Sequence, residues 1–233
     1  SSIFSLILRS YIIKITVSHL RNDETLAQLA WQGGIVNDYW RLALPTFFIF
    51  LNSIFNIAHW SRHMEEIQIA KSQIREEIAQ KFAELSAKEI AEKTNAIENR
   101  LFDFANFLES KITLLYVNNK HEAPTDNILK RAYDYNKIVV LPAYNTENFE
   151  MALKKVDDLE KDLLPGPRDI LQPDESRCKD VPTDKIDIAI IPAVALDEKG
   201  GRIGSGKGYY DRLIPRLAIT TRKVALAFEA QIV

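Results

Sequence analysis

Apolar residues recur every three or four positions across residues 64–92, and charged residues fill most of the positions between them. This spacing predicts an amphipathic helix. Within it, the run Ser86-Ala-Lys-Glu89 has the form of a capping box, so we expect a break there and the start of a second helix. The same periodicity from Thr94 to Leu108 predicts another helix, which ends near Ser110.

Short apolar runs bounded by polar segments predict strands in the rest of the chain. Helices are expected from Thr125 or Asp126 to Tyr135 and from Gly208 to Arg216, whereas 163–172 is expected to be irregular. The predicted strands are Ile112–Val117, Lys137–Leu141, Phe149–Val156, Ile186–Ile191 and Lys223–Phe228. Strands that alternate with helices indicate an α/β fold with an open, mostly parallel sheet flanked by helices, in a Rossmann-like three-layer arrangement.

The first 63 residues differ from the rest of the 233-residue chain, because they are apolar and aromatic and contain all three tryptophans. Charged residues become dense from Met64, the first methionine. We therefore predict two parts: an apolar, helical N-terminal extension of unknown role over 1–63 and a catalytic domain over 64–233. We expect the domain to fold without the extension.

The longest apolar stretch lies within this extension, at 42–60, and approaches the length of a membrane span. Pro45, Asn52 and Asn56 interrupt it, so packed helices or disorder are favoured over a membrane anchor. His59 and His63 are four residues apart, but no carboxylate completes a known metal motif around them.

Charge and cysteine content limit the function. The net charge of −2 gives no electrostatic argument for binding nucleic acid. The single cysteine, Cys178, excludes an internal disulfide and favours a reducing, cytoplasmic location. It lies in a polar run typical of a loop, where a spectator thiol is favoured over a catalytic one.

The densest chemical signal is Gly200-Gly-Arg-Ile-Gly-Ser-Gly-Lys-Gly-Tyr-Tyr-Asp-Arg212, which holds five of the eight glycines. Glycine lets backbone N–H groups approach an anion closely, and Arg202 and Lys207 add positive charge. The spacing matches neither a Walker A loop nor a dinucleotide fingerprint. A flexible turn is the alternative, but the lysine, the tandem tyrosines and Asp211 favour a ligand-binding loop.

In a parallel sheet, ligands bind at the carboxyl ends of the strands. The predicted strand that ends at Val117 leads to Glu122, and the one that ends at Ile191 leads to the glycine run. Glu122 and the glycine run are therefore expected at one edge of the sheet.

Together with Pro192-Ala-Val-Ala-Leu-Asp197, the glycine run resembles the signature of the 5-formyltetrahydrofolate cyclo-ligase family, also called 5,10-methenyltetrahydrofolate synthetases. The resemblance covers about residues 66–233. Other pieces fall in the family's order: Lys71-x-x-x-Arg75, Glu122-x-x-Thr125, Val139-Val-Leu-Pro142, Met151 and Ile170-Leu-Gln-Pro173.

The resemblance implies a reaction that uses MgATP. ATP phosphorylates the formyl oxygen of 5-formyltetrahydrofolate to an iminium phosphate. N10 of the folate then attacks, giving 5,10-methenyltetrahydrofolate, ADP and phosphate. The implied partner is the folate, with or without a polyglutamate tail. A monomer or weak dimer is expected, with no nucleic acid and no membrane.

The resemblance also implies roles for individual residues. Glu122, Ser205 and Tyr209 would contact the folate, and Asp211 would bind Mg²⁺. Lys207 and Arg202 would act on the transferred phosphoryl group. The nucleotide would be held by Lys71, Arg75, Arg202, Ile203, Gly204, Ser205, Gly206, Lys207, Gly208, Tyr209 and Tyr210.

The sequence departs from the family pattern in two places. Residue 205 is serine where the family usually has a larger side chain. The chain stops after Gln231-Ile-Val233, where the family continues into an acidic tail with a second Mg²⁺-binding aspartate. Weak or no activity is therefore expected, and a non-catalytic module that binds folate or nucleotide stays open as the alternative.

Overall fold

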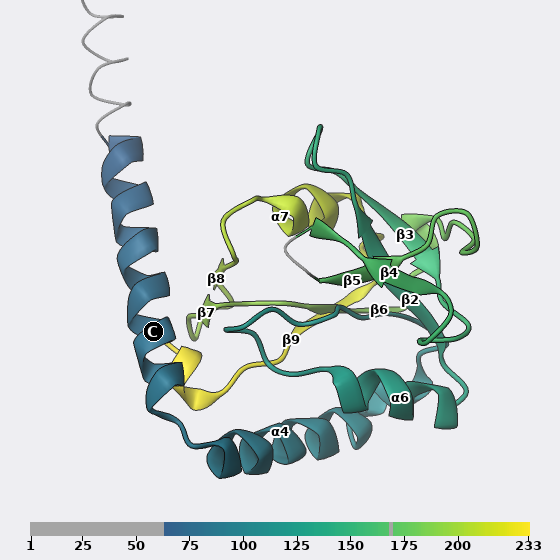
Figure 1. Ribbon diagram of the computed structural model, residues 1–233, viewed down its shortest axis with the longest axis horizontal. Coiled ribbons are helices and arrows are strands. Elements are labelled where there is room, and N and C mark those ends of the chain that lie inside the picture. Colours follow the sequence, from purple (N-terminus) through teal and green to yellow (C-terminus); the bar gives the residue numbers. More distant parts are fainter. Residues whose placement is uncertain (1–62, 168–169) are drawn as a thin grey trace, which may run out of the picture. The chain divides into compact units, whose positions relative to one another are not determined.

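A computed structural model describes residues 63–167 and 170–233, and those from Glu65 onward form one compact unit. At its centre is a five-stranded sheet in the order β3-β2-β1-β6-β9 (Figure 1). The strands are β1 Ile112–Leu114, β2 Ile138–Tyr144, β3 Met151–Lys155, β6 Ile188–Ile191 and β9 Arg222–Ala225. All neighbouring pairs are parallel except β2 and β3, so the predicted mostly parallel sheet is confirmed, with an antiparallel strand at one edge.

The strands are buried on both faces, which accounts for their nearly continuous apolar sequences. Val139 and Ile190 pack into a cluster with the helices α4 (Ala87–Phe102), α5 (Ala105–Glu109) and α6 (Asp126–Asp134). Their neighbours Val140 and Ile191 point the other way, toward α7 (Tyr209–Leu213) and the 3₁₀ helix η3 (Ile214–Arg216). Side chains alternate between faces along a strand, so these two clusters make the three-layer arrangement.

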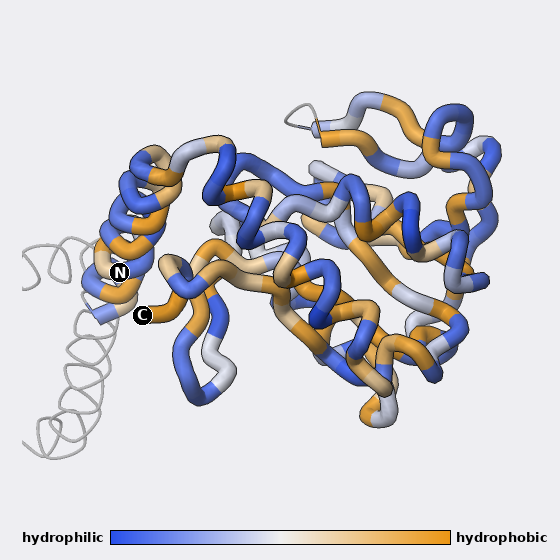
Figure 2. Tube along the Cα trace, turned by 90° about the horizontal axis from the view of Figure 1, so that it is seen from below, coloured by the Kyte–Doolittle hydropathy of each residue, from blue (hydrophilic) through white to orange (hydrophobic). Residues whose placement is uncertain are grey.

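Residues 63–84 form the long helix that the sequence predicts, and it alternates between polar and apolar positions (Figure 2). Ile78 and Phe82 on its buried side pack against Phe228 near the other end of the chain. The capping box at Ser86 is confirmed: its hydroxyl accepts the Glu89 N–H at 3.2 Å, and the Glu89 carboxylate accepts the Ser86 N–H at 2.9 Å.

Several predicted boundaries were wrong. A single helix runs through 92–94, because Thr94 and Glu98 continue its buried face. The segment predicted to be irregular contains a two-stranded hairpin of β4 (Leu163–Pro165) and β5 (Leu171–Pro173). The sequence did not predict this pairing, because a proline lies at the end of each strand and proline is unfavourable within strands. The helix expected from Gly208 to Arg216 divides into α7 and η3, and Pro215 lies in the first turn of η3.

A second short hairpin leads into the glycine run. It joins β7 (Ala195–Leu196) to β8 (Arg202–Ile203) through a turn at Asp197–Gly200. The Asp197 carboxylate accepts the N–H groups of Lys199 and Gly201 at 2.8 and 2.6 Å. Gly200 has a φ of +87°, a conformation that few residues other than glycine adopt. The start of the glycine run is thus held in a defined position.

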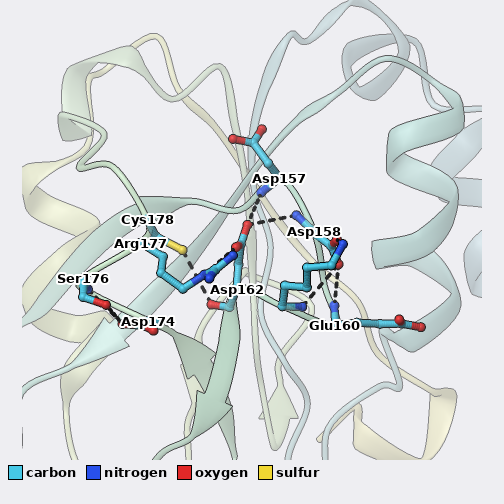
Figure 3. Close-up of polar contacts among 9 residues, drawn as sticks. Asp157, Asp158, Glu160, Asp162, Asp174, Ser176, Arg177 and Cys178 are labelled. Atoms are coloured by element: carbon cyan, nitrogen blue, oxygen red, sulfur yellow. Dashed lines mark hydrogen bonds and ion pairs between the residues drawn. The ribbon is translucent and has the colours of Figure 1, made fainter.

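Asp162 ties together the two ends of the β4–β5 hairpin (Figure 3). Its carboxylate accepts the N–H groups of Asp157 and Asp158 at 3.1 and 3.0 Å and the Arg177 guanidinium at 3.3 Å. These bonds and the Arg177 charge lower the pKa of Asp162. Cys178 donates weakly to the Asp162 carbonyl at 3.6 Å, and burial raises the pKa of this thiol. The buried, protonated thiol agrees with a structural role.

The buried ammonium of Lys137 holds the end of α5, which contributes to one face of the core. Its Nζ donates to the carbonyls of Phe107, Leu108 and Ser110 at 2.5, 2.8 and 2.6 Å. We expect Lys137→Met to lower the free energy of unfolding by about 2–4 kcal/mol, because it leaves buried carbonyls without donors. Urea denaturation measures this change, with exposed Lys130→Met as the control. An equal loss in both variants would contradict the role of Lys137.

Among the described helices, none combines the length and the apolar character that a membrane crossing requires. The predicted extension and its apolar run at 42–60 fall outside the described residues except for His63. The division at Met64 stays a prediction.

Candidate functional site

A cavity of ≈ 710 Å³ opens at the carboxyl ends of β1 and β6. These two parallel strands are neighbours, but the chain leaves β1 toward β2 and enters β6 on the opposite side. Such a topological switch point is where open α/β sheets bind ligands. The residues predicted for the site all line this cavity: Lys71, Arg75, Glu122, Arg202, Ile203, Gly204, Ser205, Gly206, Lys207, Gly208, Tyr209, Tyr210 and Asp211.

Arginine side chains hold the carbonyl groups of the glycine run. Arg75 Nε donates to the Gly204 carbonyl at 2.9 Å, across 129 residues of sequence. Arg212 Nη1 donates to the carbonyls of Lys207 and Gly208 at 3.3 and 3.1 Å. Because these carbonyls are engaged by guanidinium groups, they repel an approaching anion less than free carbonyls would.

Besides Gly200, two positions in the run have a backbone conformation that favours glycine. Gly206 and Gly208 have φ values of +102° and +72°. Residues with positive φ beside ordinary ones bring successive N–H groups together, which is how backbone nests bind phosphate. Side chains at these positions would strain the loop, so the glycine spacing and the anion-binding capacity have the same origin.

The cavity wall carries more positive than negative charge. Five cations contribute to it, Lys71, Arg75, Arg202, Lys207 and Arg212, against the carboxylates of Glu122 and Asp211. Within the described part of the chain, no carboxylate forms an ion pair with Lys71 or Lys207. This balance suits a polyanion such as a triphosphate.

Asp211 forms an ion pair with Arg202, whose guanidinium also donates to the Pro192 carbonyl at 3.0 Å. The Asp211 side chain is 71% exposed, whereas that of Arg202 is 13% exposed. No group of three or more His, Cys, Asp or Glu side chains suited to a metal occurs in the parts of the chain that the structure describes. Mg²⁺ is often held by one or two carboxylates with phosphate oxygens and water, so Asp211 suits a metal that arrives with phosphates.

Glu122 is the buried residue of a tight turn after β1. Its carboxylate accepts the Asn119 N–H at 2.9 Å, and its own N–H donates to the Asn119 carbonyl at 3.1 Å. Only 8% of Glu122 is exposed. Thr125 fastens the end of the turn by donating to the Tyr116 carbonyl at 2.7 Å. The carboxylate is therefore held in one position, as recognition of a polar ring would require.

Tyr210 is buried, unlike the other residues that were predicted to contact the nucleotide. It is 7% exposed and lies on the core side of α7. Burial raises the pKa of Tyr210 well above its ordinary value, and Tyr144 and Glu122 add to the rise.

Aromatic side chains from the end of β2 and from the β2–β3 connection complete the wall, and the sequence did not point to them. Tyr209 packs edge-on against Tyr144 with ring centroids 5.0 Å apart, and it donates to the Asn145 carbonyl at 3.3 Å. Phe149, with a φ of +57°, lies under the Arg212 guanidinium. The lining residues that were not predicted are Gln68, Val117, Asn119, Tyr144, Thr146, Phe149, Pro167, Ile170, Pro192 and Arg212.

Known proteins resemble this chain in both sequence and fold. The model of the 5-formyltetrahydrofolate cyclo-ligase family matches residues 67–233. The mouse (Mus musculus) 5-formyltetrahydrofolate cyclo-ligase is 28% identical over 174 residues, which is 71% of this chain and 86% of the mouse protein. A probable 5-formyltetrahydrofolate cyclo-ligase of Caenorhabditis elegans is 28% identical over 179 residues, 73% of this chain and 87% of the relative.

Solved structures give the same result. The 5,10-methenyltetrahydrofolate synthetase of Aquifex aeolicus superposes with a TM-score of 0.61 at 30% identity, covering 70% of this chain and 79% of that one. The Mycoplasma pneumoniae synthetase, at 22% identity and a TM-score of 0.56 over 70% of this chain and 88% of that one, shares the fold. Since the family model matches well over half of the sequence, the chain belongs to the 5-formyltetrahydrofolate cyclo-ligase family.

Proposed function

We propose that this protein converts 5-formyltetrahydrofolate and ATP to 5,10-methenyltetrahydrofolate, ADP and phosphate. The observation that carries the proposal is the cavity at the switch point, where a cation-rich glycine loop and a buried carboxylate line one space. The folate substrate is inferred from the name of the family, and the positive charge of the cavity supports a polyphosphate as the second substrate.

In this proposal, the formyl oxygen attacks the γ-phosphorus of ATP, and ADP leaves. The lone pair of N10 then forms a bond to the activated carbon, phosphate departs with its electron pair, and N10 loses its proton. The protein contributes alignment and charge stabilisation, which are the main needs of phosphoryl transfer.

The two ends of the cavity are assigned to the two substrates. Lys71, Arg75 and the glycine run would bind the triphosphate, with Lys207 and Arg202 beside the phosphoryl group in transit. Glu122 would accept hydrogen bonds from adjacent N–H donors of the pterin, since a carboxylate accepts two such bonds. Ser205 and Tyr209 would line the folate between the two ends.

A magnesium ion would neutralise the phosphates and polarise the transferred group when bound. Asp211 would be its protein ligand, which requires Arg202 to release that carboxylate. The freed Arg202 would still be fixed through the Pro192 carbonyl and could turn toward phosphate.

Formation of 5,10-methenyltetrahydrofolate, followed by its absorbance, tests the proposal. We expect product from 5-formyltetrahydrofolate only when ATP and Mg²⁺ are both present, with one ADP released per product. Binding of both substrates without product would instead support the non-catalytic module. If neither substrate binds, both the proposed enzyme and the non-catalytic binding module are contradicted.

A further inference from the structure

Gln231 is a fully buried polar residue in the 3₁₀ helix η4 (Glu229–Gln231). Its Oε1 accepts the Phe228 N–H at 2.9 Å. Its Nε2 donates to the carbonyls of Ala193 and Val194 at 2.9 and 3.0 Å and to that of His121 at 3.2 Å. An N–H on one side and three carbonyls on the other fix the orientation of the amide, since only its NH₂ can donate.

These carbonyls belong to two loops that follow β1 and β6 and lead to residues of the cavity wall. His121 directly precedes Glu122 in the tight turn after β1. Ala193 and Val194 follow Pro192, whose carbonyl accepts a hydrogen bond from Arg202. The Val194 N–H donates to the Ile203 carbonyl at 2.8 Å. One side chain therefore bridges the Glu122 turn and the segment that carries the start of the glycine run.

The bridge spans large distances in sequence, 110 residues to His121 and 38 to Ala193. β1 and β6 pair along Thr113–Leu114 and Ile188–Ala189, before the two loops begin. The sheet fixes where each loop starts. The Gln231 amide links the loops beyond that point, inside the core, where a hydrogen bond is strong and its loss leaves unpaired carbonyls.

We propose that Gln231 is a positioning residue for the reaction, which sets the spacing between the Glu122 turn and the Pro192–Val194 segment. This inference rests on the proposed function, because the two loops would hold the folate and the phosphates. When the bridge is weakened, the residues that would bind each substrate are still present, so the affinity for each substrate should change little. What changes is the alignment of the formyl oxygen with the phosphorus, on which the rate depends steeply.

Gln231→Glu tests this role with almost no change of shape. Its carboxylate keeps an acceptor for Phe228, but when ionised it faces the three carbonyls without a hydrogen to donate. When protonated, it can donate one hydrogen bond. Burial among carbonyls favours the protonated form. We expect kcat to fall by about tenfold or more at neutral pH, with the dissociation constants of folate and ATP within about threefold of the parent. The ratio of variant to parent kcat should rise as pH is lowered.

Thr221→Val is the matched control. Thr221 is also buried and donates to the Ile186 carbonyl at 2.8 Å, but it lies at the amino ends of β6 and β9, away from the cavity. It should lower thermal stability without changing kcat. A Gln231→Glu variant whose kcat stays within twofold of the parent at every pH, or whose ratio of variant to parent kcat falls as pH is lowered, would overturn the proposal.

Amide hydrogen exchange of the ligand-free, full-length chain separates this inference from the proposed function. Gln231→Glu should speed exchange in both 118–123 and 193–196, and Thr221→Val should affect neither. Unchanged exchange in the two loops refutes the bridge even if the enzyme is active. A parent that makes no product, combined with faster exchange in the variant, refutes the proposed function and leaves the bridge in place.

Discussion

Replacing Lys207 by alanine is expected to lower turnover by roughly 30- to 1,000-fold, equivalent to about 2–4 kcal/mol of transition-state stabilisation. Its side chain is exposed in the cavity wall, and in the described part of the chain no carboxylate neutralises it. Charge builds on the phosphoryl oxygens during transfer, so the loss should fall on kcat. The affinity for 5-formyltetrahydrofolate should stay nearly constant.

Lys199→Ala serves as the control for net charge. Lys199 is exposed in the turn before the glycine run and does not line the cavity. Steady-state kinetics of both variants, together with folate titration, separates the two effects. A Lys207→Ala variant with parental kcat would remove this residue from the mechanism, and equal losses in both variants would indicate a general effect of charge.

Glu122→Gln is expected to weaken 5-formyltetrahydrofolate binding by roughly 10- to 100-fold, since a charged acceptor replaced by an amide loses about 1.5–3 kcal/mol. The glutamine carbonyl can still accept the Asn119 N–H, so the turn should keep its shape. Asp211→Asn is the matched variant on the glycine run. It should weaken MgATP binding and leave folate affinity nearly unchanged.

Calorimetric titration of both variants with both ligands gives four affinities. Loss of ATP binding in Glu122→Gln, with folate binding retained, would show that the two substrates have been assigned to the wrong loops. If both variants bound both ligands more weakly, the Glu122 turn and the glycine run would act as one unit.

Local patterns in the sequence were enough to predict the sheet and the glycine loop. Apolar runs such as Ile188–Ile191 identify buried strands, and the density of glycine identifies the loop, three of whose five glycines have positive φ. The sequence did not predict the aromatic side chains of the cavity wall, because Tyr144 and Phe149 contact Tyr209 only once β2 and β3 have paired. Likewise, Gln231 reads as an ordinary polar residue, and its burial becomes evident only when three distant segments come together. Contacts of this kind depend on tertiary packing, which a one-dimensional pattern does not encode.

The pairing of Arg202 with Asp211 has a consequence for the order in which ligands arrive. A bare divalent cation would have to compete with a guanidinium for one carboxylate and would gain nothing in exchange. A nucleotide that carried its own metal would offer phosphates to Arg202 while that metal took Asp211 as a ligand, so Arg202 and Asp211 would both keep partners of opposite charge. The site would thereby discriminate against free metal and free ATP alike and accept the two as a preassembled complex. In the same way, departure of ADP and phosphate would let the arginine and the aspartate reunite, which resets the site for the next cycle.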